Sequence, residues 1–165
     1  MMKLVVIWMG VLFLFSCIQR KEKFKTGLEG KSMPSIDLIL ADGTTHFNTD
    51  SIPPGKPTVL FSFETWCPYC RAQTKAMVSN MKMLKDINII MLCKGKASEL
   101  RQFSSQYQLV DFSNIMTGID YKKTFAYYFN TSKFPYMAIY NKDKKLNQIL
   151  LGKNYISTIK EIAFD

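Results

Sequence analysis

The sequence has few of the residues from which metal and nucleic-acid sites are built. It contains one histidine, His46, and four cysteines: Cys17, Cys67, Cys70 and Cys93. A structural zinc site would need two further ligands beside the close pair Cys67 and Cys70, so no metal site is expected. The net charge is +9, but the basic residues are spread along the chain without interleaved aromatic residues. Nucleic-acid binding is therefore not expected.

Long hydrophobic runs are also absent. The apolar run after Lys3, Leu4–Phe15, is too short to span a bilayer but fits the core of a signal peptide. It ends in Leu14-Phe15-Ser16-Cys17, which resembles a bacterial lipoprotein processing site. We therefore predict a lipoprotein signal peptide at 1–16, lipidation of Cys17, a polar tether at 17–31 and a domain at 32–165. An ordinary signal peptide that happens to lie near Cys17 is the alternative.

The cysteine pair follows a predicted buried strand directly. The run Thr58–Phe63 is β-branched and aromatic, as in a central strand. Apolar residues recur at helical spacing from Pro68 to Lys85, so this segment is predicted to be a helix. Cys67 then falls near the N-cap and Pro68 at the first helical position, where proline is favoured.

The remaining chain alternates between strand and helix patterns. The predicted strands are a hairpin at Ser35–Phe47, then Ile87–Cys93, Asn114–Thr117, Phe134–Tyr140 and Leu146–Gly152. The predicted helices are Ser98–Leu109, capped by Ser98, then Tyr121–Phe129, capped by Asp120, and Tyr155–Phe164. This order indicates an α/β fold whose central sheet is mixed and flanked by helices.

A redox dithiol explains the pair better than a metal site or a disulfide scaffold, because lipidation of Cys17 leaves no even set of spaced cysteines. The thiolate is the nucleophile in exchange, and a helix N-terminus favours the anion. Cys67 would attack, and Cys70, one turn further on, would resolve the mixed disulfide. These roles predict that Cys67 is open to partners and that Cys70 is shielded.

The motif Trp66-Cys67-Pro68-Tyr69-Cys70, with "KFPYMAIYNKDKK" downstream, resembles the thioredoxin superfamily. Within it, the segment Ser32–Asp165 resembles the TlpA/ResA-like group of membrane-tethered thiol–disulfide oxidoreductases. The resemblance implies a thioredoxin-like fold with an N-terminal β-hairpin and an inserted βα unit at 87–109. It also implies disulfide exchange without a cofactor.

The same resemblance assigns further site residues and partners. Pro135 matches the family's cis-proline, and Phe134 would offer backbone hydrogen bonds to substrate. Trp66 and Tyr69 would be surface aromatics beside the nucleophile. The implied partners are oxidised secreted proteins, such as apocytochrome c, and a membrane thiol carrier that supplies electrons; the lipid on Cys17 would anchor the protein to a membrane.

Two positions depart from the family pattern. Phe61 stands where minimal thioredoxin has a buried aspartate, and Gln73 stands where TlpA/ResA-like proteins often have a glutamate. Both carboxylates help to deprotonate the second cysteine. Glu64, three positions before Cys67, is the nearest carboxylate in the sequence. It either takes over this role or is an exposed loop residue.

Two other functions stay open. A peroxiredoxin-type peroxidase would need Pro-x-x-x-Thr-x-x-Cys, but Leu60 and Glu64 occupy the proline and threonine positions. A non-catalytic lipoprotein module that only binds partners is disfavoured by the intact cysteine pair. Cys93 lies within "IIMLC" and is expected to be a buried, inert thiol. The motif fits both a reductant and an oxidant, and we favour a reductant.

Overall fold

The fold is built on the strand that precedes the cysteine pair. All six residues of this strand, β3 (Thr58–Phe63), are buried. It pairs in parallel with β4 (Asn88–Cys93) and antiparallel with β6 (Tyr136–Tyr140). Side chains of a strand alternate between the two faces of its sheet, so a strand that is apolar throughout must be covered on both.

The computed structural model describes residues 24–165. The other strands are β1 (Asp37–Leu40), β2 (His46–Asn48), β5 (Ile115–Ile119) and β7 (Leu146–Leu151). The α-helices are α1 (Pro68–Ser79), α2 (Met81–Leu84), α3 (Ala97–Gln106), α4 (Thr124–Tyr128) and α5 (Ile156–Phe164), with 3-10 turns at Thr49–Ser51 and Leu109–Asp111.

The strands form one seven-stranded sheet in the order β2-β1-β5-β4-β3-β6-β7. The pairs β3–β4 and β4–β5 are parallel, and all other neighbours are antiparallel. This arrangement confirms the predicted mixed α/β sheet. The N-terminal hairpin is β1 and β2, and the predicted βα unit at 87–109 corresponds to β4 and α3.

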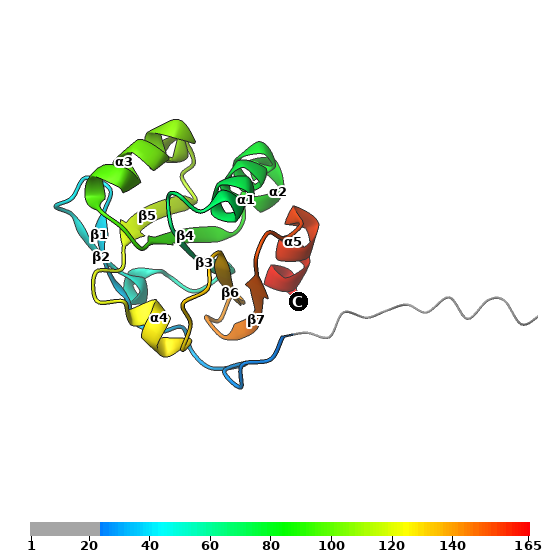
Figure 1. The fold of residues 1–165 in the computed structure, drawn as a ribbon. Coiled ribbons are helices and arrows are strands. Elements are labelled where there is room, and N and C mark those ends of the chain that lie inside the picture. Colours follow the sequence, from blue (N-terminus) through cyan, green and yellow to red (C-terminus); the bar gives the residue numbers. More distant parts are fainter. Residues whose placement is uncertain (1–23) are drawn as a thin grey trace, which may run out of the picture.

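Two apolar cores lie on opposite faces of the sheet. Helices α1, α2, α3 and α5 cover one face, where they pack on Val59, Phe61 and Phe63 of β3 (Figure 1). Helix α4 covers the other face together with the segment before β3, and there Leu60 is buried against Phe125 and its neighbours. The dithiol helix α1 therefore begins at the edge of the sheet where β3 ends.

Three predicted helices differ in extent from the structure. The helix predicted over 68–85 breaks at Asn80, whose backbone is not helical and whose side chain bonds to the carbonyl of Ala76. Helix α3 begins at Ala97, after Lys96, so Ser98 lies inside the helix and is not its N-cap. Helix α4 is shorter, but Asp120 still accepts hydrogen bonds from its first N–H groups, at 2.8 and 2.9 Å.

The predicted signal peptide and Cys17 lie outside the described residues. The end of the predicted tether is described, and Gly30 and Lys31 form backbone hydrogen bonds with Leu146 at 2.8 and 2.9 Å. Within residues 24–165, no helix has both the length and the apolar character needed to cross a bilayer.

Candidate active site

Cys67 is the N-cap residue of α1, as the sequence predicts. Its sulfur accepts a hydrogen bond from the backbone N–H of Cys70 at 3.3 Å, and Pro68 follows at the start of the helix. The first N–H groups of a helix have no intrahelical partner and carry a partial positive charge. The sulfur of Cys67 therefore lies where backbone donors stabilise a thiolate.

Both cysteines are free thiols, and they differ little in exposure. Cys70 is fully buried, which confirms the prediction that it is shielded. Cys67 is only 7% exposed, so it is less accessible than the predicted attacking thiol, which should be open to partners. An attacking sulfur needs only a narrow opening, but the partner must then bring its disulfide close to the start of α1.

The thiols of Cys70 and Cys93 are both buried, and burial disfavours their thiolate forms. Burial raises the pKa of Cys70, and the hydrogen bond with Cys67 raises it further. A backbone hydrogen bond of Glu64 partly offsets this increase, and the charges of Cys67 and Glu64 add smaller increases. Burial also raises the pKa of Cys93 to about 12, with smaller contributions from the charges of Glu99 and Glu64. Cys70 therefore needs a proton acceptor if it is to attack at neutral pH.

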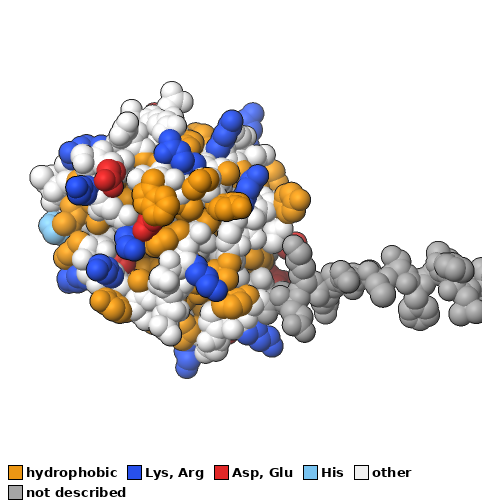
Figure 2. All heavy atoms as spheres, viewed as in Figure 1, with side chains coloured by type: hydrophobic (Ala, Val, Ile, Leu, Met, Phe, Trp, Pro, Cys, Tyr) orange, Lys and Arg blue, Asp and Glu red, His pale blue; other side chains and the backbone are white. Residues whose placement is uncertain are grey.

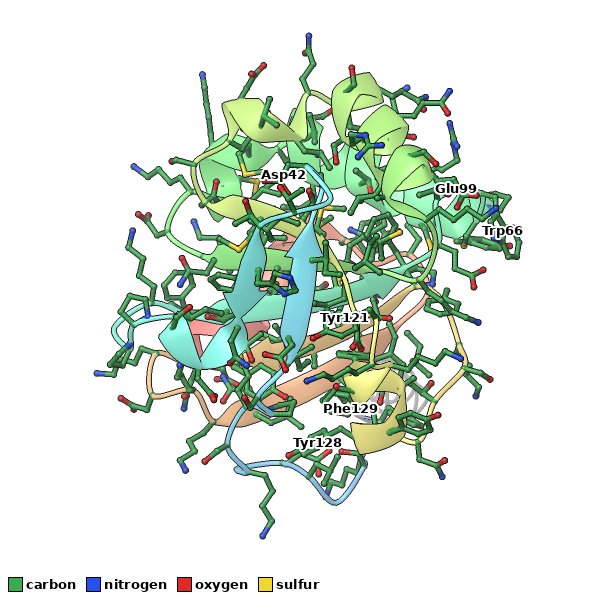
Figure 3. All side chains as sticks on the ribbon, turned by 90° about the vertical axis from the view of Figure 1, so that its left-hand side faces the viewer. Asp42, Trp66, Glu99, Tyr121, Tyr128 and Phe129 are labelled. Atoms are coloured by element: carbon green, nitrogen blue, oxygen red, sulfur yellow. The ribbon has the colours of Figure 1, made fainter. Side chains whose placement is uncertain are left out.

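Two aromatic side chains flank the nucleophile on the surface. Trp66 is 72% exposed and Tyr69 is 67% exposed, as predicted. A cavity of about 160 Å³ lies beside Trp66 and extends to α3, where Glu99 and Phe103 line it. Figure 3 shows Trp66 and Glu99 at the same edge of the molecule. In Figure 2, hydrophobic side chains are exposed in the middle of the face, with Lys and Arg side chains around them.

Pro135 lies at the same edge of the sheet as the dithiol. Because Ser62 pairs with Tyr136 in the antiparallel register of β3 and β6, Pro135 lies opposite Phe63. The Phe134–Pro135 peptide bond is cis, the form that the resemblance implies. Within the described residues, neither backbone polar group of Phe134 has a hydrogen-bond partner. Phe134 thus presents a free donor and acceptor next to the thiols.

Glu64 is buried, so the alternative that it is an exposed loop residue is wrong. It is 8% exposed, and its carboxylate forms an ion pair with Lys94 Nζ at 3.3 Å. Lys94 Nζ also lies 5.5 Å from the centre of the Phe134 ring. A cavity of about 150 Å³ borders both Lys94 and Phe134. Glu64, Lys94 and Phe134 therefore form a continuous set beside the dithiol.

Positions 61 and 73, where the resemblance would place a carboxylate, hold uncharged residues. Gln73 is fully buried, and its Oε1 accepts a hydrogen bond from the backbone N–H of Asn154 at 2.6 Å. Its Nε2 has no partner among the described residues. Phe61 is also fully buried and stacks on Phe63, with ring centres 5.5 Å apart.

The remaining candidates lie apart from the dithiol. His46 is exposed on β2, and its ring is perpendicular to that of Tyr121, with the ring centres 6.3 Å apart. No group of three or more metal-ligating side chains occurs in residues 24–165. Cys93 is buried at the end of β4, in the same core as the pair.

Lys94 was missed by sequence reasoning, although a signal for it was present. Strands β3 and β4 are parallel, and Phe63 pairs with Cys93. Residues that directly follow neighbouring parallel strands meet at one edge of the sheet. Glu64 and Lys94 are those residues, so their opposite charges predict the ion pair once the two strands are placed side by side.

Several solved structures have a similar fold. The structure is similar to a secreted disulfide oxidoreductase from Mycobacterium tuberculosis homologous to E. coli DsbE (18% identity, TM-score 0.62, 77% of this chain and 93% of that chain). It is also similar to StoA from Bacillus subtilis (12% identity, TM-score 0.59, 78% and 96%). A third similar structure is the thioredoxin domain of a thiol-disulfide oxidoreductase from Bacteroides vulgatus (14% identity, TM-score 0.60, 81% and 93%).

At these identities the similarity shows the thioredoxin-like fold and nothing finer. No curated protein matches the chain. Residues 30–149, most of the sequence, match the AhpC/TSA family. The chain therefore belongs to the AhpC/TSA family of thioredoxin-like proteins.

Proposed function

We propose that the protein is a thiol–disulfide oxidoreductase that reduces disulfides of secreted proteins through Cys67 and Cys70. The observation that carries the proposal is the position of Cys67 Sγ at the N-terminus of α1, in contact with the N–H of Cys70, while Cys70 is buried behind it. This arrangement separates a nucleophile from a resolving thiol.

The reaction takes two exchange steps. The thiolate of Cys67 attacks one sulfur of the substrate disulfide, which releases one substrate thiol and leaves a mixed disulfide. Cys70 then attacks Cys67 Sγ, which breaks the mixed disulfide, releases the second substrate thiol and closes the Cys67–Cys70 disulfide. The substrate gains two electrons and the dithiol loses two. A membrane thiol carrier would restore the dithiol.

The proposed setting is outside the cytoplasmic membrane, with Cys17 as the lipidated anchor. One structurally similar protein is secreted. Residues 30–31, at the end of the proposed tether, form two backbone hydrogen bonds with Leu146. The free backbone groups of Phe134 are suited to pair with an extended substrate segment. Oxidised secreted proteins, apocytochrome c among them, fit this arrangement as substrates.

A peroxidase is the weaker candidate within the same family. Peroxidase chemistry of the peroxiredoxin type uses a threonine three positions before the reactive cysteine, and here Glu64 occupies that position and is ion-paired with Lys94. A module that only binds partners would have no need for a free thiol at a helix N-terminus. Both alternatives predict no disulfide reduction by the purified protein.

The test is a redox titration of the full chain combined with trapping. A reductant should have a potential near that of thioredoxin, about −270 mV, rather than about −120 mV as for DsbA. Cys67→Ala should abolish disulfide exchange, and Cys70→Ala should accumulate a mixed disulfide with substrate. Full activity in Cys67→Ala would overturn the proposed function.

A further inference from the structure

Three exposed lysines from separate parts of the chain lie around the cis peptide bond: Lys94, Lys133 and Lys153. Lys133 directly precedes Phe134. Lys153 directly follows Gly152, whose backbone N–H donates a hydrogen bond to the carbonyl of the cis proline at 3.0 Å. Lys94 Nζ lies 5.5 Å from the centre of the Phe134 ring. The free backbone groups of Phe134 are therefore bordered by these three side chains, which we call the lysine set.

The lysine set carries more positive charge than its surroundings balance. Glu64 forms an ion pair with Lys94 at 3.3 Å. The other two lysines of the set form no ion pair within residues 24–165. In the adjacent cavity, Lys123 and Asp120 contribute opposite charges. With four lysines against two carboxylates, this surface keeps an excess of two positive charges.

The Trp66 side of the dithiol has no such excess. The cavity beside Trp66 is lined by one cation, Arg71, and by one anion, Glu99, so its lining charges balance. The positive charge is therefore concentrated on the side where Phe134 can pair with a substrate segment.

The lysine set lies at the end of the sheet opposite to the one that the N-terminal segment joins. Residues 30–31 form backbone hydrogen bonds with Leu146, which pairs with Tyr140. Tyr140 in turn pairs with Thr58, at the start of β3. The dithiol follows the other end of this six-residue strand, which is about 20 Å away at the usual rise per residue. A lipid on Cys17 would therefore join the domain from its far end, so the lysine set is open to a soluble partner rather than to a membrane.

We propose that the lysine set selects substrate proteins whose disulfide is flanked by aspartate or glutamate residues. This inference rests on the proposed function, since it names the substrates of the same dithiol. In an extended segment that pairs with Phe134, residues advance by about 3.3 Å each and alternate in direction. Carboxylates that flank the paired residue therefore come within reach of Lys133 and Lys153. The lysines take no part in the exchange steps, and their attraction speeds encounter and orients the segment.

The experiment measures the reduction of short disulfide-containing peptides by the full, reduced chain. The peptides differ only in the residues on both sides of the disulfide, which are glutamate, glutamine or lysine. Acid quenching and mass analysis give a second-order rate constant for each peptide. At about 20 mM salt, the glutamate peptide should react about tenfold faster than the glutamine peptide, and the lysine peptide about tenfold slower. At about 0.5 M salt, these differences should fall below about twofold, because salt screens exposed charges.

A double variant, Lys133→Gln with Lys153→Gln, tests the lysine set directly. Its rate with the glutamate peptide should fall about fivefold at low salt, while its rate with the glutamine peptide should change less than about twofold. The unchanged rate with the glutamine peptide shows that the dithiol is intact. The matched control is Lys82→Gln with Lys142→Gln, which removes the same net charge from α2 and from the turn after β6. This control should leave all three rates within about twofold of the wild type.

Several results would overturn the inference. Equal rates for the three peptides with the wild-type chain, or an unchanged glutamate rate in the lysine-set variant, would show that flanking charge is not recognised there. An equal fall in the control variant would show that the net charge acts and not the lysine set. If phosphatidylglycerol vesicles slow the glutamate peptide with the wild type but not with the lysine-set variant, a lipid surface occupies the set instead. Failure of the wild type to reduce any of the peptides would refute the proposed function, so the two failures are distinguishable.

Discussion

Glu64 and Gln73 are both buried polar residues near Cys70, but they are held in opposite ways. Glu64, which directly follows β3, forms an ion pair with Lys94 at 3.3 Å. Gln73, on the helix side, is neutral and holds the backbone of Asn154 at 2.6 Å. Glu64 therefore contacts an exposed lysine side chain, whereas Gln73 contacts the backbone of the loop between β7 and α5.

This difference shows where the site can tolerate charge. A carboxylate at the strand edge can be neutralised by a lysine that reaches in from solvent. Gln73 is fully buried, and a carboxylate at that position would lose its hydration. The chain therefore carries its buried charge at Glu64 and uses an amide at Gln73 for structure.

The largest loss of stability is expected when a carboxylate is placed inside strand β3, at position 61. In Phe61→Asp, a carboxylate replaces a fully buried ring that stacks on Phe63. Loss of a buried phenylalanine costs about 3–5 kcal/mol of the free energy of unfolding, and an unpaired buried carboxylate adds to that cost. Urea unfolding at pH 7 should show a loss above about 4 kcal/mol or no folded protein. Phe61→Leu is the control, and a loss below about 1 kcal/mol in Phe61→Asp would contradict the comparison.

A smaller effect with a distinct pH dependence is expected from Gln73→Glu. Burial would raise the pKa of the new carboxyl above its unfolded value of about 4.3. The folded state then holds its proton over a range in which the unfolded state has lost it. The free energy of unfolding should therefore fall by about 1.4 kcal/mol per pH unit above about pH 4.3, until the raised pKa is reached. Urea unfolding from pH 4 to 8 measures this slope.

Gln73→Met is the matched control, since it removes the amide without adding a titratable group. Its loss of stability, which comes from the unpaired N–H of Asn154, should be the same at every pH. If Gln73→Glu is as stable at pH 8 as at pH 5 relative to this control, the core can accommodate a charge there after all.

The large features of the fold followed from the sequence because they depend on local patterns. The buried strand Thr58–Phe63 and the helix that begins at Pro68 lie where the apolar pattern and the proline place them. The break at Asn80 did not follow, because no glycine or proline marks it. It depends on a side chain that bonds back to the carbonyl of Ala76.

The positions of Cys67 and Cys70 could also be predicted from the sequence, but the charged and polar residues around them could not. The motif fixed Cys67 at the N-cap and Cys70 within the first turn. The burial of Glu64 depends on Lys94, thirty residues away in sequence, and on the parallel register of β3 and β4. The hydrogen bond between Gln73 and Asn154 joins α1 to a loop near the C-terminus, and no local sequence pattern predicts it.

The ion pair itself should make a modest contribution to stability. The side chain of Lys94 is 59% exposed and that of Glu64 is 10% exposed, so the pair is intermediate between a surface ion pair and a buried one. Lys94→Met should lower the free energy of unfolding at pH 7 by about 1 kcal/mol. In a double-mutant cycle with Glu64→Gln, the second substitution should cost less than the first. Additive losses would show that the two side chains do not interact in solution.

The smallest effect on exchange is expected from the third thiol at this edge, because Cys93 cannot ionise easily. Burial, with the nearby charges of Glu99 and Glu64, raises the pKa of Cys93 to about 12. At pH 8 the folded protein should react with iodoacetamide at Cys67 and leave Cys93 unmodified, as peptide mass analysis would detect. Cys93→Ala should change the rate of disulfide exchange less than twofold. A raised folded pKa means that the wild type loses stability above about pH 8.5, where the unfolded thiol ionises, and that Cys93→Ala lacks this loss. Rapid labelling of Cys93 at pH 8 would instead place a second reactive thiol beside Glu64.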